Sequence, residues 1–479
     1  GLVRIWDAQG KVLGELGAES EATPAKLSQP PQTVAAKVPP PSFVRDVLPA
    51  LNQAGCASGG CHSKPEGQSG FKLSVFSYDP LSDYAEIVRD ARSRRVFPAA
   101  PEESLILLKA LTRVPHEGGQ RFQPGSPTHQ LLTRWIRSGM PYAVDPETLE
   151  TIGTSDFDGT VMRLSAHSRP DEHTGELIFF DYSIKAPYMQ YGVVGPDRKL
   201  RHKIDVDLPG PSLPHDMAIT EHYTILHDFP LRPDPEALKA GRYKIKFDGT
   251  QPSRFGIVPR YGQSNEVKWF NAKPAYMLHV VNAWEEGDEV VMVGTPYKIH
   301  LDDHGQPDGR RLEKTIHNRQ RDFMLYEWRF DLKTGQTREH IIDDVLNTEF
   351  PAINSLYQGR KNRYSYNIIF AHGGKEEVRF PGLVKYDISA GSYVAYSAGP
   401  QFFYNEPGFA PRDNSQAEDD GYLVVLVWNP KDEQSEIQIF DCRGAKMAEG
   451  PIARVILPRR IPHGFHATYV SQTTLNRWK

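Results

Sequence analysis

Residues 421–443 read GYLVVLVWNPKDEQSEIQIFDCR, two strand-like segments on either side of an Asn-Pro turn signal. Similar alternating segments recur after Tyr142, separated by Asp-Gly, Gly-Asp and Thr-Gly turn signals. They include GELIFFDYSI (175–184), YTILHDFPL (223–231), DEVVMVGTPY (288–297), DFMLYEWRFDL (322–332) and SYNIIFAHG (365–373). Many short strands at fairly even spacing predict a sandwich, a barrel or a propeller, and the length of this region favours a propeller.

The composition of the 479-residue chain is that of a folded protein, because 39% hydrophobic and 24% charged residues are ordinary globular values. Its 39 Gly and 39 Pro favour short elements joined by turns. A formal net charge of −4 gives no net basic field, so nucleic acid is not the expected partner. No run approaches the ~20 apolar residues of a transmembrane helix, although peripheral membrane contact is compatible with the sequence. The opening at Gly1 suggests a mature or excised fragment.

Four regions follow one another along the chain. Residues 1–16 predict a hairpin whose VRIWD segment resembles the closing strand of a WD40 blade, either as a leftover strand remnant or as part of an ordinary hairpin. Residues 17–42 are a Pro-rich linker. Residues 43–140 place apolar side chains at helical spacing and predict a small all-α domain. The β-rich region occupies residues 141–479.

Cys56, Cys61 and His62 lie in one short stretch at the start of the predicted helical domain. Two cysteine thioethers can anchor the edge of a porphyrin while the adjacent histidine binds its iron, as in c-type haem attachment. The usual motif has two residues between the cysteines, whereas this chain has four. A Cys56–Cys61 disulfide and half of a zinc site are therefore alternatives.

The helical region resembles the cytochrome c-like domains of large planctomycete proteins. The resemblance rests on GCASGGCHSKPEGQSGFKLSVFSYDP (55–80), RRVFPAAPEESLILLKA (94–110), VPHEGGQRFQPGSP (114–127) and LLTRWIRSGMPY (131–142). It implies covalent haem c on Cys56 and Cys61, with His62 as the proximal ligand. His116 precedes the last helix, where such a domain usually supplies its distal ligand, and Met140 is a poorer candidate.

Four of the 17 histidines stand at predicted strand edges in distinctive settings. They are His167 in LSAHSRPDEHTGEL, His215 in LPGPSLPHDMAIT, His279 in AYMLHVVNAWEEGD and His466 in RIPHGFHATYV. Such dispersal is expected if blades of a propeller each point one residue at a common axis. Neutral imidazoles can hold Fe(II), and four ligands leave positions open for oxygen. His300 and His304, in a turn with two Asp residues, are more simply a surface feature.

Residues 141–479 resemble the carotenoid cleavage oxygenase family, which also contains the lignostilbene dioxygenases. The matching stretches are PYAVDPETLETIG (141–153), FFDYSIKAPYMQYGVV (179–194), ITEHYTILHDFPLRPDPEAL (219–238), NTEFPAIN (347–354), YNEPGF (404–409) and the four histidine segments. The resemblance implies a seven-bladed β-propeller with one non-haem Fe(II) on its axis. It also implies that Glu349 and Glu406 accept the far N–H groups of metal-binding histidines.

Two departures from that family bear on activity. The amino-terminal segment that supplies the first blade is absent, so we expect a propeller that lacks its N-terminal part and leaves a sheet edge unpaired. A third glutamate is expected shortly before Pro141-Tyr142, but this chain has Arg137-Ser138-Gly139-Met140 there. A cation cannot accept the imidazole proton and opposes the charge of the iron.

The sequence thus predicts an Fe(II)-dependent dioxygenase that cleaves a conjugated C=C bond of a carotenoid, apocarotenoid or stilbene into two carbonyl products, with O2 and a small apolar substrate as partners. Aromatic residues near the metal segments are tunnel candidates, with core packing as the simpler role: Tyr188, Tyr276, Trp284, Phe350, Phe403 and Phe465. The alternatives are a haem c electron-transfer or sensing protein with the propeller as scaffold, and an inactive propeller that holds zinc or no metal. The oxygenase region suggests a cytoplasmic location, whereas the haem motif suggests a periplasmic one.

Overall fold

The chain forms two compact units, which are described separately. The computed structural model describes residues 3–7, 12–16, 41–57, 61–63, 67–89, 95–97, 100–137, 143–144, 151–153, 164–239, 244–298, 308, 322–373, 377–458, 460–461, 466–472 and 474. The helical unit comprises Thr23–Arg163 and Asp234–Lys244. The β unit comprises Gly1–Ala22, Leu164–Pro233 and Ile245–Lys479.

The helical unit contains the helices that the sequence predicted between residues 43 and 140. They are η1 (Phe43–Val47), α1 (Leu48–Gln53), η2 (Val75–Ser77), α2 (Pro80–Tyr84), η3 (Ala85–Arg89), η5 (Pro101–Glu103), α3 (Leu105–Ala110) and α4 (Pro127–Arg137). The unit also includes β3 (Ala143–Val144), β4 (Thr151–Gly153) and α5 (Pro235–Lys239).

Helix α4 shows why this region is helical. Proline at its first position needs no backbone hydrogen bond, and apolar residues at spacings of three and four form one face. Leu132, Trp135 and Ile136 of that face are buried. The Trp135 ring packs 5.3 Å from the ring of Phe43, centroid to centroid, so α4 and η1 share a small apolar core.

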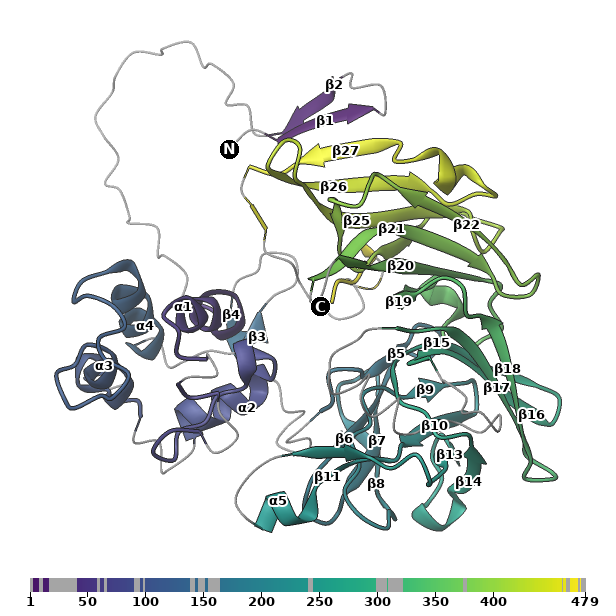
Figure 1. The fold of residues 1–479 in the computed structure, drawn as a ribbon, viewed down its shortest axis with the longest axis horizontal. Helices are drawn as coiled ribbons and strands as arrows, with labels where there is room; N and C mark the ends of the chain where they lie inside the picture. The colour runs from purple at the N-terminus through teal and green to yellow at the C-terminus, as the bar shows by residue number, and fades with distance from the viewer. Residues whose placement is uncertain are drawn as a thin grey trace. The chain divides into compact units, whose positions relative to one another are not determined.

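The β unit consists of antiparallel sheets that follow one another along the chain from teal to yellow in Figure 1. In the part of the chain that the structure describes, four sheets have four strands each. The first has β5 (Arg169–Asp171), β6 (Glu176–Tyr182), β7 (Met189–Val194) and β8 (Leu200–Val206). The second has β9 (Ala218–Ile219), β10 (Tyr223–Asp228), β13 (Ser253–Pro259) and β14 (Lys268–Ala272).

The remaining sheets complete this order. The third sheet has β15 (Met277–Glu286), β16 (Glu289–Pro296), β17 (Leu325–Asp331) and β18 (Thr337–Asp343). The fourth has β19 (Thr348–Ala352), β20 (Tyr364–Gly373), β21 (Glu377–Asp387) and β22 (Ser392–Ser397). A two-stranded ribbon joins β11 (Leu231–Pro233) and β12 (Ile245–Phe247). The last sheet contains β23 (Phe403–Tyr404), β24 (Gly408–Pro411), β25 (Gly421–Asn429), β26 (Gln434–Asp441) and β27 (Ala453–Ile456).

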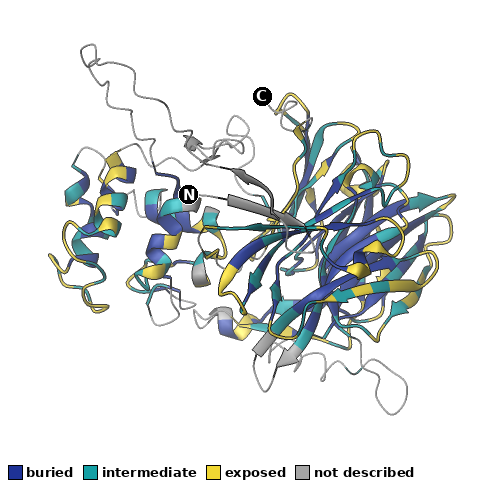
Figure 2. Ribbon diagram, turned by 90° about the horizontal axis from the view of Figure 1, so that it is seen from above, coloured by how far each residue is buried: buried dark blue, intermediate teal, exposed yellow. Residues whose placement is uncertain are grey.

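The strand pair at residues 421–443 confirms the sequence prediction. Along β25, buried and half-buried residues alternate without exception, as expected for a strand with unequal faces. β25 pairs with β26 from Tyr422 opposite Asp441 to Asn429 opposite Gln434. Figure 2 shows the strands of the β unit dark blue or teal over much of their length, with yellow concentrated in loops.

The N-terminal hairpin does not form a separate remnant. Strands β1 (Val3–Asp7) and β2 (Val12–Leu16) pair with each other, and β1 also pairs with β27. The first and last of the described strands therefore share one sheet, in which the hairpin pairs with an edge of β27. The two strands form the hairpin that the sequence predicted for residues 1–16, and this hairpin extends the C-terminal sheet.

The fold is mainly β with few helices, as the sequence predicted. The described residues form five sheets of four or more strands. Seven blades remain a prediction. Among the described helices, none combines the length and apolar character that crossing a membrane requires.

Candidate metal centre

Four histidines from separate segments of the β unit meet at one point. His167 precedes β5, His215 precedes β9, His279 lies on β15, and His466 follows β27. One potential ligand atom from each lies within 4.8 Å of the others. Residues separated by up to three hundred positions thus converge, and these are the four histidines that the sequence singled out.

The ring geometry suits a single metal ion. The His167 ring centre lies 4.6 Å from that of His215, 4.9 Å from that of His279 and 4.8 Å from that of His466. The Nε2 atoms of His167 and His215 are 3.1 Å apart. The Nε2 atom of His279 is buried and has no hydrogen-bond partner among the described residues. A buried nitrogen without a partner is costly unless a ligand occupies its lone pair.

The electrostatics keep two of these rings neutral. Burial lowers the pKa of His167 to about 2 and that of His215 to about 4. A neutral imidazole has a free lone pair, which is the form that binds a metal ion. The donor set therefore fits a transition metal such as iron, for which imidazole is a suitable ligand.

The two glutamates that the sequence singled out, Glu349 and Glu406, each lie beside Nδ1 of one of the four histidines. Glu349, fully buried, has a carboxylate oxygen 2.6 Å from Nδ1 of His279. Glu406 has a carboxylate oxygen 2.9 Å from Nδ1 of His466 and also accepts the backbone N–H of Ala467 at 2.7 Å. When Nδ1 donates to the carboxylate, Nε2 is left as the metal-facing atom.

The charge of Glu349 also acts on the ring of His279. Burial opposes the charged form of His279, but the adjacent Glu349 carboxylate outweighs it and raises the pKa of the imidazole. Burial likewise disfavours the ionised carboxylate, yet His279 and the hydrogen bonds from Phe350 N–H and Thr295 hold the pKa of Glu349 below its usual range. The carboxylate is therefore ionised beside the ring.

Sequence reasoning missed an ion pair between half-buried Arg169 and buried Asp216, which joins three of the histidine segments. Arg169 donates to the carboxylate of Asp216, and its Nε also donates to the carbonyl oxygen of Met217 at 3.1 Å. Asp216 accepts the backbone N–H of Val280 at 2.8 Å. Burial would raise the pKa of Asp216, but Arg169 and its other partners lower it to about 2.

Each member of this network lies one or two residues from a metal-site histidine. Arg169 follows His167 by two positions, Asp216 follows His215 directly, and Val280 follows His279 directly. The network therefore links the three segments that carry His167, His215 and His279 and holds them at a fixed spacing. The sequence offered one indication of this network, a charged residue close to each of two histidines, Arg169 near His167 and Asp216 after His215. Charged residues in such a position are also typical of a solvated loop.

Of the tunnel candidates that the structure describes, Phe350 is the one with ring contacts to the four histidines. Its ring centre is 5.2 Å from that of His279 and 5.6 Å from that of His466. Its backbone has φ = 52°, an unusual conformation for a bulky residue and one that is found at functional sites. This part of β19 places both the Glu349 carboxylate and the Phe350 ring beside His279.

The other aromatic candidates occupy different places. Tyr276 and Trp284 are buried in separate apolar clusters, and Tyr188 packs against a third. Phe403 is half-buried against Phe380, with ring centres 4.5 Å apart. For Tyr276 and Trp284, the core role that the sequence offered as the simpler one agrees with their burial.

Several predicted residues lie outside the described part of the chain. They are His300, His304, Phe465 and three residues, Ser138, Gly139 and Met140, of the stretch 137–140 in which a third glutamate was expected. Arg137, at the start of that stretch, is described and pairs with Glu102 at 2.6 Å within the helical unit.

Comparison with known proteins identifies the family. The family described as retinal pigment epithelial membrane protein matches residues 126–471. The chain belongs to this family, the carotenoid cleavage oxygenases. The Sphingomonas paucimobilis lignostilbene-alpha,beta-dioxygenase isozyme III is 31% identical over 69% of this chain and 70% of the relative. The Crocus sativus carotenoid 9,10(9',10')-cleavage dioxygenase is 33% identical over 73% of this chain. This oxygenase-family chain spans 66% of that relative, just under two thirds of its length.

Solved structures agree with this assignment. The Pseudomonas brassicacearum lignostilbene dioxygenase has a TM-score of 0.60 and 29% identity, covering 68% of this chain and 70% of that one. A Synechocystis apocarotenoid oxygenase has a TM-score of 0.57 and 25% identity, covering 67% and 68%. Carotenoid oxygenases are β-propellers, so the β unit has the propeller fold of its relatives.

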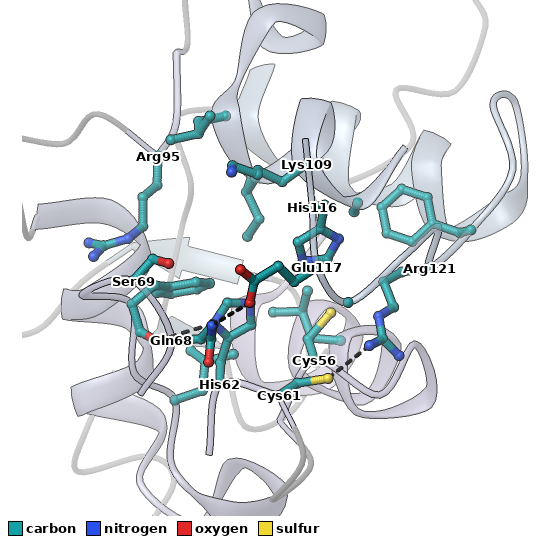
Figure 3. Close-up of a pocket in the computed structure, with 18 of the residues that line it drawn as sticks. Cys56, Cys61, His62, Gln68, Ser69, Arg95, Lys109, His116, Glu117 and Arg121 are labelled. Carbon is teal, nitrogen blue, oxygen red and sulfur yellow. Dashed lines mark hydrogen bonds between the residues drawn. The ribbon is translucent and has the colours of Figure 1, made fainter. Parts of the chain in front are cut away.

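The helical unit holds a second group of predicted site residues. Cys56, Cys61, His62 and His116 line one cavity of about 770 Å³, shown in Figure 3. Both cysteines are free, so the alternative of a Cys56–Cys61 disulfide is not realised. Burial raises the pKa of Cys56 to about 11, which keeps its thiol protonated. Within the described residues, no three of these side chains bring their ligand atoms together as a zinc site requires.

Proposed function

We propose that this chain is an Fe(II)-dependent dioxygenase that cleaves one conjugated C=C bond of a carotenoid, an apocarotenoid or a stilbene. Both atoms of O2 end in the products, so that one alkene and one O2 give two carbonyl compounds. The observation that carries the proposal is the convergence of four histidine nitrogens within 4.8 Å. Its support is that relatives and neighbours named as carotenoid, apocarotenoid and lignostilbene oxygenases share the family and the fold.

His167, His215, His279 and His466 would hold the iron through neutral imidazoles. When bound, ferrous iron supplies the redox chemistry that allows O2 to react with a closed-shell alkene. The four ligands add no charge of their own, so the carboxylates of Glu349 and Glu406 provide the nearest negative charge behind the rings. Each carboxylate accepts a hydrogen bond from Nδ1–H, which keeps the proton on that nitrogen and leaves Nε2 to face the metal.

Arg169, Asp216 and Phe350 would position the metal ligands and the substrate, and would not themselves react. The Arg169–Asp216 pair anchors the segments of His167, His215 and His279. The Phe350 ring, half-buried beside His279 and His466, offers a flat apolar surface to a conjugated chain or ring. Together these groups hold the metal rigidly and leave an aromatic contact for the substrate.

The test is oxygen consumption by the full chain after anaerobic loading with Fe(II). A resveratrol-like stilbene and an apocarotenal form the two substrate arms, and aldehyde products are identified by mass. We expect O2 uptake and product in equal amounts in at least one arm, with none when Co(II) replaces Fe(II). A cobalt-substituted Synechocystis oxygenase has been solved, so cobalt occupancy is a feasible control. Background O2 uptake in both arms, with iron fully bound, would contradict the proposal.

A second function, electron transfer by a covalent haem c in the helical unit, is supported by a different observation. Cys56, Cys61 and His62 line a cavity whose volume lies in the range of cofactor pockets. Addition of both thiols to the porphyrin vinyl groups would form two C–S bonds, with each thiol proton passing to the neighbouring vinyl carbon. A pyridine haemochrome spectrum of chain made with a cytochrome c maturation system tests this, with a Cys56→Ser, Cys61→Ser variant as the control. Absence of covalent haem in the unaltered chain would exclude this function.

A further inference from the structure

Strand β15 carries His279 at an irregularity in its pairing with β16. The register shifts between Met277 and Val280, where two residues of β15 stand opposite a single residue of β16, Thr295. Such an arrangement is a β-bulge, and His279 is one of its two residues. Bulges bend a strand and re-aim a side chain, and they are common next to active sites. The residue opposite the bulge is therefore in a position to influence how His279 is held.

The side chain of Thr295 is fully buried beside this bulge. Its Oγ1 atom lies 3.1 Å from the carbonyl oxygen of His279 and 3.0 Å from Oε1 of Glu349. A hydroxyl has one proton to donate, and of these two acceptors the ionised carboxylate is the stronger. Thr295 thus contacts both the backbone of His279 and the carboxylate that orients the His279 ring.

The two oxygens of the Glu349 carboxylate have different donors. Oε2 lies 2.6 Å from Nδ1 of His279 and also accepts the backbone N–H of Phe350. Oε1 accepts from the hydroxyl of Thr295. A carboxylate that is held at both oxygens cannot turn about its terminal bond, so Oε2 stays in line with Nδ1 of His279. The Thr295 hydroxyl therefore restricts the ring of His279 through Glu349.

The residue before Thr295 allows β16 to approach the bulge closely. A Cβ atom added at Gly294 would collide with Sδ of Met277 and would lie 3.3 Å from the carbonyl oxygen of His279. A larger residue would push β16 away from β15 and lengthen the contacts that Thr295 makes. Glycine at this position therefore keeps the hydroxyl within reach of both of its acceptors.

We propose that Thr295 is a positioning residue of the metal centre, which fixes the direction in which Nε2 of His279 faces the metal ion. The inference rests on the proposed function, because it requires iron to bind to the four histidines. The effect of Thr295 on the metal passes through the carboxylate of Glu349 and the backbone of His279. Loss of the hydroxyl should therefore change metal binding without removing a ligand.

The experiment measures metal binding by the full chain in the absence of turnover. Chelator competition under anaerobic conditions gives the Fe(II) affinity, and the visible absorption of the Co(II)-loaded chain reports the geometry of the ligands. Thr295→Val removes the hydroxyl while keeping a side chain of similar size. We expect the Fe(II) affinity to fall by about 10-fold, the lower end of the range for residues behind a metal ligand, and the Co(II) bands to shift. Thr295→Ser retains the hydroxyl and should keep both properties close to those of the unaltered chain.

Two controls separate positioning from general packing. Thr224 is also fully buried, but its hydroxyl donates to the hydroxyl of Tyr191 at 3.0 Å. Thr224→Val should lower the free energy of unfolding without altering the Fe(II) affinity or the Co(II) spectrum. Because Thr295 acts through Glu349, Thr295→Val should cost less affinity in a Glu349→Gln background than in the unaltered chain.

The outcomes distinguish this inference from the function on which it rests. An unaltered chain that binds no Fe(II) overturns both. If the unaltered chain binds Fe(II), three results overturn the inference alone: unchanged affinity and Co(II) spectrum in Thr295→Val, equal changes in Thr295→Val and Thr224→Val, or strictly additive losses with Glu349→Gln. Thr295→Ala is a second variant without the hydroxyl, for the case that valine disturbs folding, and it should show the same loss of affinity.

Discussion

Nδ1 of His279 lies 2.6 Å from the carboxylate of Glu349, and the opposite ring nitrogen has no partner among the described residues. The carboxylate is fully buried and the imidazole side chain is 8% exposed. A buried ionised carboxylate is costly unless it is paired and hydrogen-bonded. The arrangement is therefore that of a metal ligand, His279, whose ring is oriented by Glu349 so that Nε2 is free to bind a metal ion.

Replacing Glu349 by Gln should weaken metal binding with little change in fold. Gln keeps an oxygen that accepts the Nδ1 proton but removes the negative charge behind the ring. Loss of such a partner commonly lowers metal affinity or activity by about 10- to 100-fold. Competition with a chelator measures the Fe(II) affinity, and circular dichroism verifies the fold. Unchanged affinity in Glu349→Gln would remove Glu349 from the metal site.

Glu406→Gln should have a smaller effect, which makes it the matched comparison. His466 is 39% exposed, so water already screens the charge of its carboxylate partner. We expect a loss of affinity of only a few-fold, measured by the same competition, and a stronger dependence on salt concentration than for Glu349→Gln. Equal losses in the two variants would show that burial does not set the strength of these contacts.

The Arg169–Asp216 pair gives a second prediction, on stability. Removing one partner of a buried ion pair leaves an uncompensated charge and typically costs about 3–5 kcal/mol. Arg169→Met should therefore lower the free energy of unfolding by about this amount. Arg169→Met combined with Asp216→Asn should recover part of it, because the stranded carboxylate is gone. Denaturant unfolding of the two single variants and the double variant measures the coupling, and strictly additive effects would contradict it.

The same pair illustrates the limit of sequence reasoning. The four histidines and both glutamates could be predicted, because each stands in a distinctive stretch of residues. Arg169 begins β5 and Asp216 lies in a loop 47 positions further along the chain, and no local pattern indicates that they pair or that Asp216 is buried. The pairing of β1 with β27 was beyond reach for the same reason, since a strand pattern specifies a face but not the neighbouring strand.

The periodicity of apolar residues predicted single strands and helices correctly, because it depends only on residues within one element. The alternation in β25 and the apolar face of α4 follow directly from the repeat of a strand and a helix. Aromatic residues near the metal segments were harder to assign. Phe350 lies beside the histidines while Trp284 is buried in a separate cluster, a difference set by strand register and by the left-handed backbone at Phe350.

Phe350→Leu should affect substrate binding more than metal binding. Aromatic contacts contribute about 0.5–1.5 kcal/mol beyond burial, so we expect KM to rise by about 2- to 12-fold. Iron content should not change, since Phe350 is not a ligand. Phe402→Leu is the control, because Phe402 is a buried core residue without a ring contact to the four histidines in the described structure. A KM change of the same size in both variants would indicate general loosening rather than a substrate contact.

His227 should make the β unit sensitive to acid. Burial lowers the pKa of His227 from its ordinary value of 6.5 to about 4, and neither ring nitrogen has a hydrogen-bond partner in the described part of the chain. The unfolded chain therefore takes up a proton below pH 6.5 that the folded chain refuses until about pH 4. Above pH 6.5 His227 is neutral in both the folded and the unfolded chain and does not reduce the free energy of unfolding. As the pH falls from 6.5 towards 4, protonation of the unfolded chain lowers that free energy.

The size of this effect follows from the shift. Linkage gives a loss of about 2 kcal/mol between pH 7.5 and pH 5, and about 3 kcal/mol when fully developed. His227 packs 5.4 Å from the rings of both Phe229 and Phe255, so His227→Phe places an apolar ring among others and should abolish its share of the pH dependence. His340→Phe, at an exposed position on β18, should leave that dependence unchanged. Guanidinium unfolding at the two pH values measures the difference, and equal pH slopes in His227→Phe and the unaltered chain would contradict the assignment.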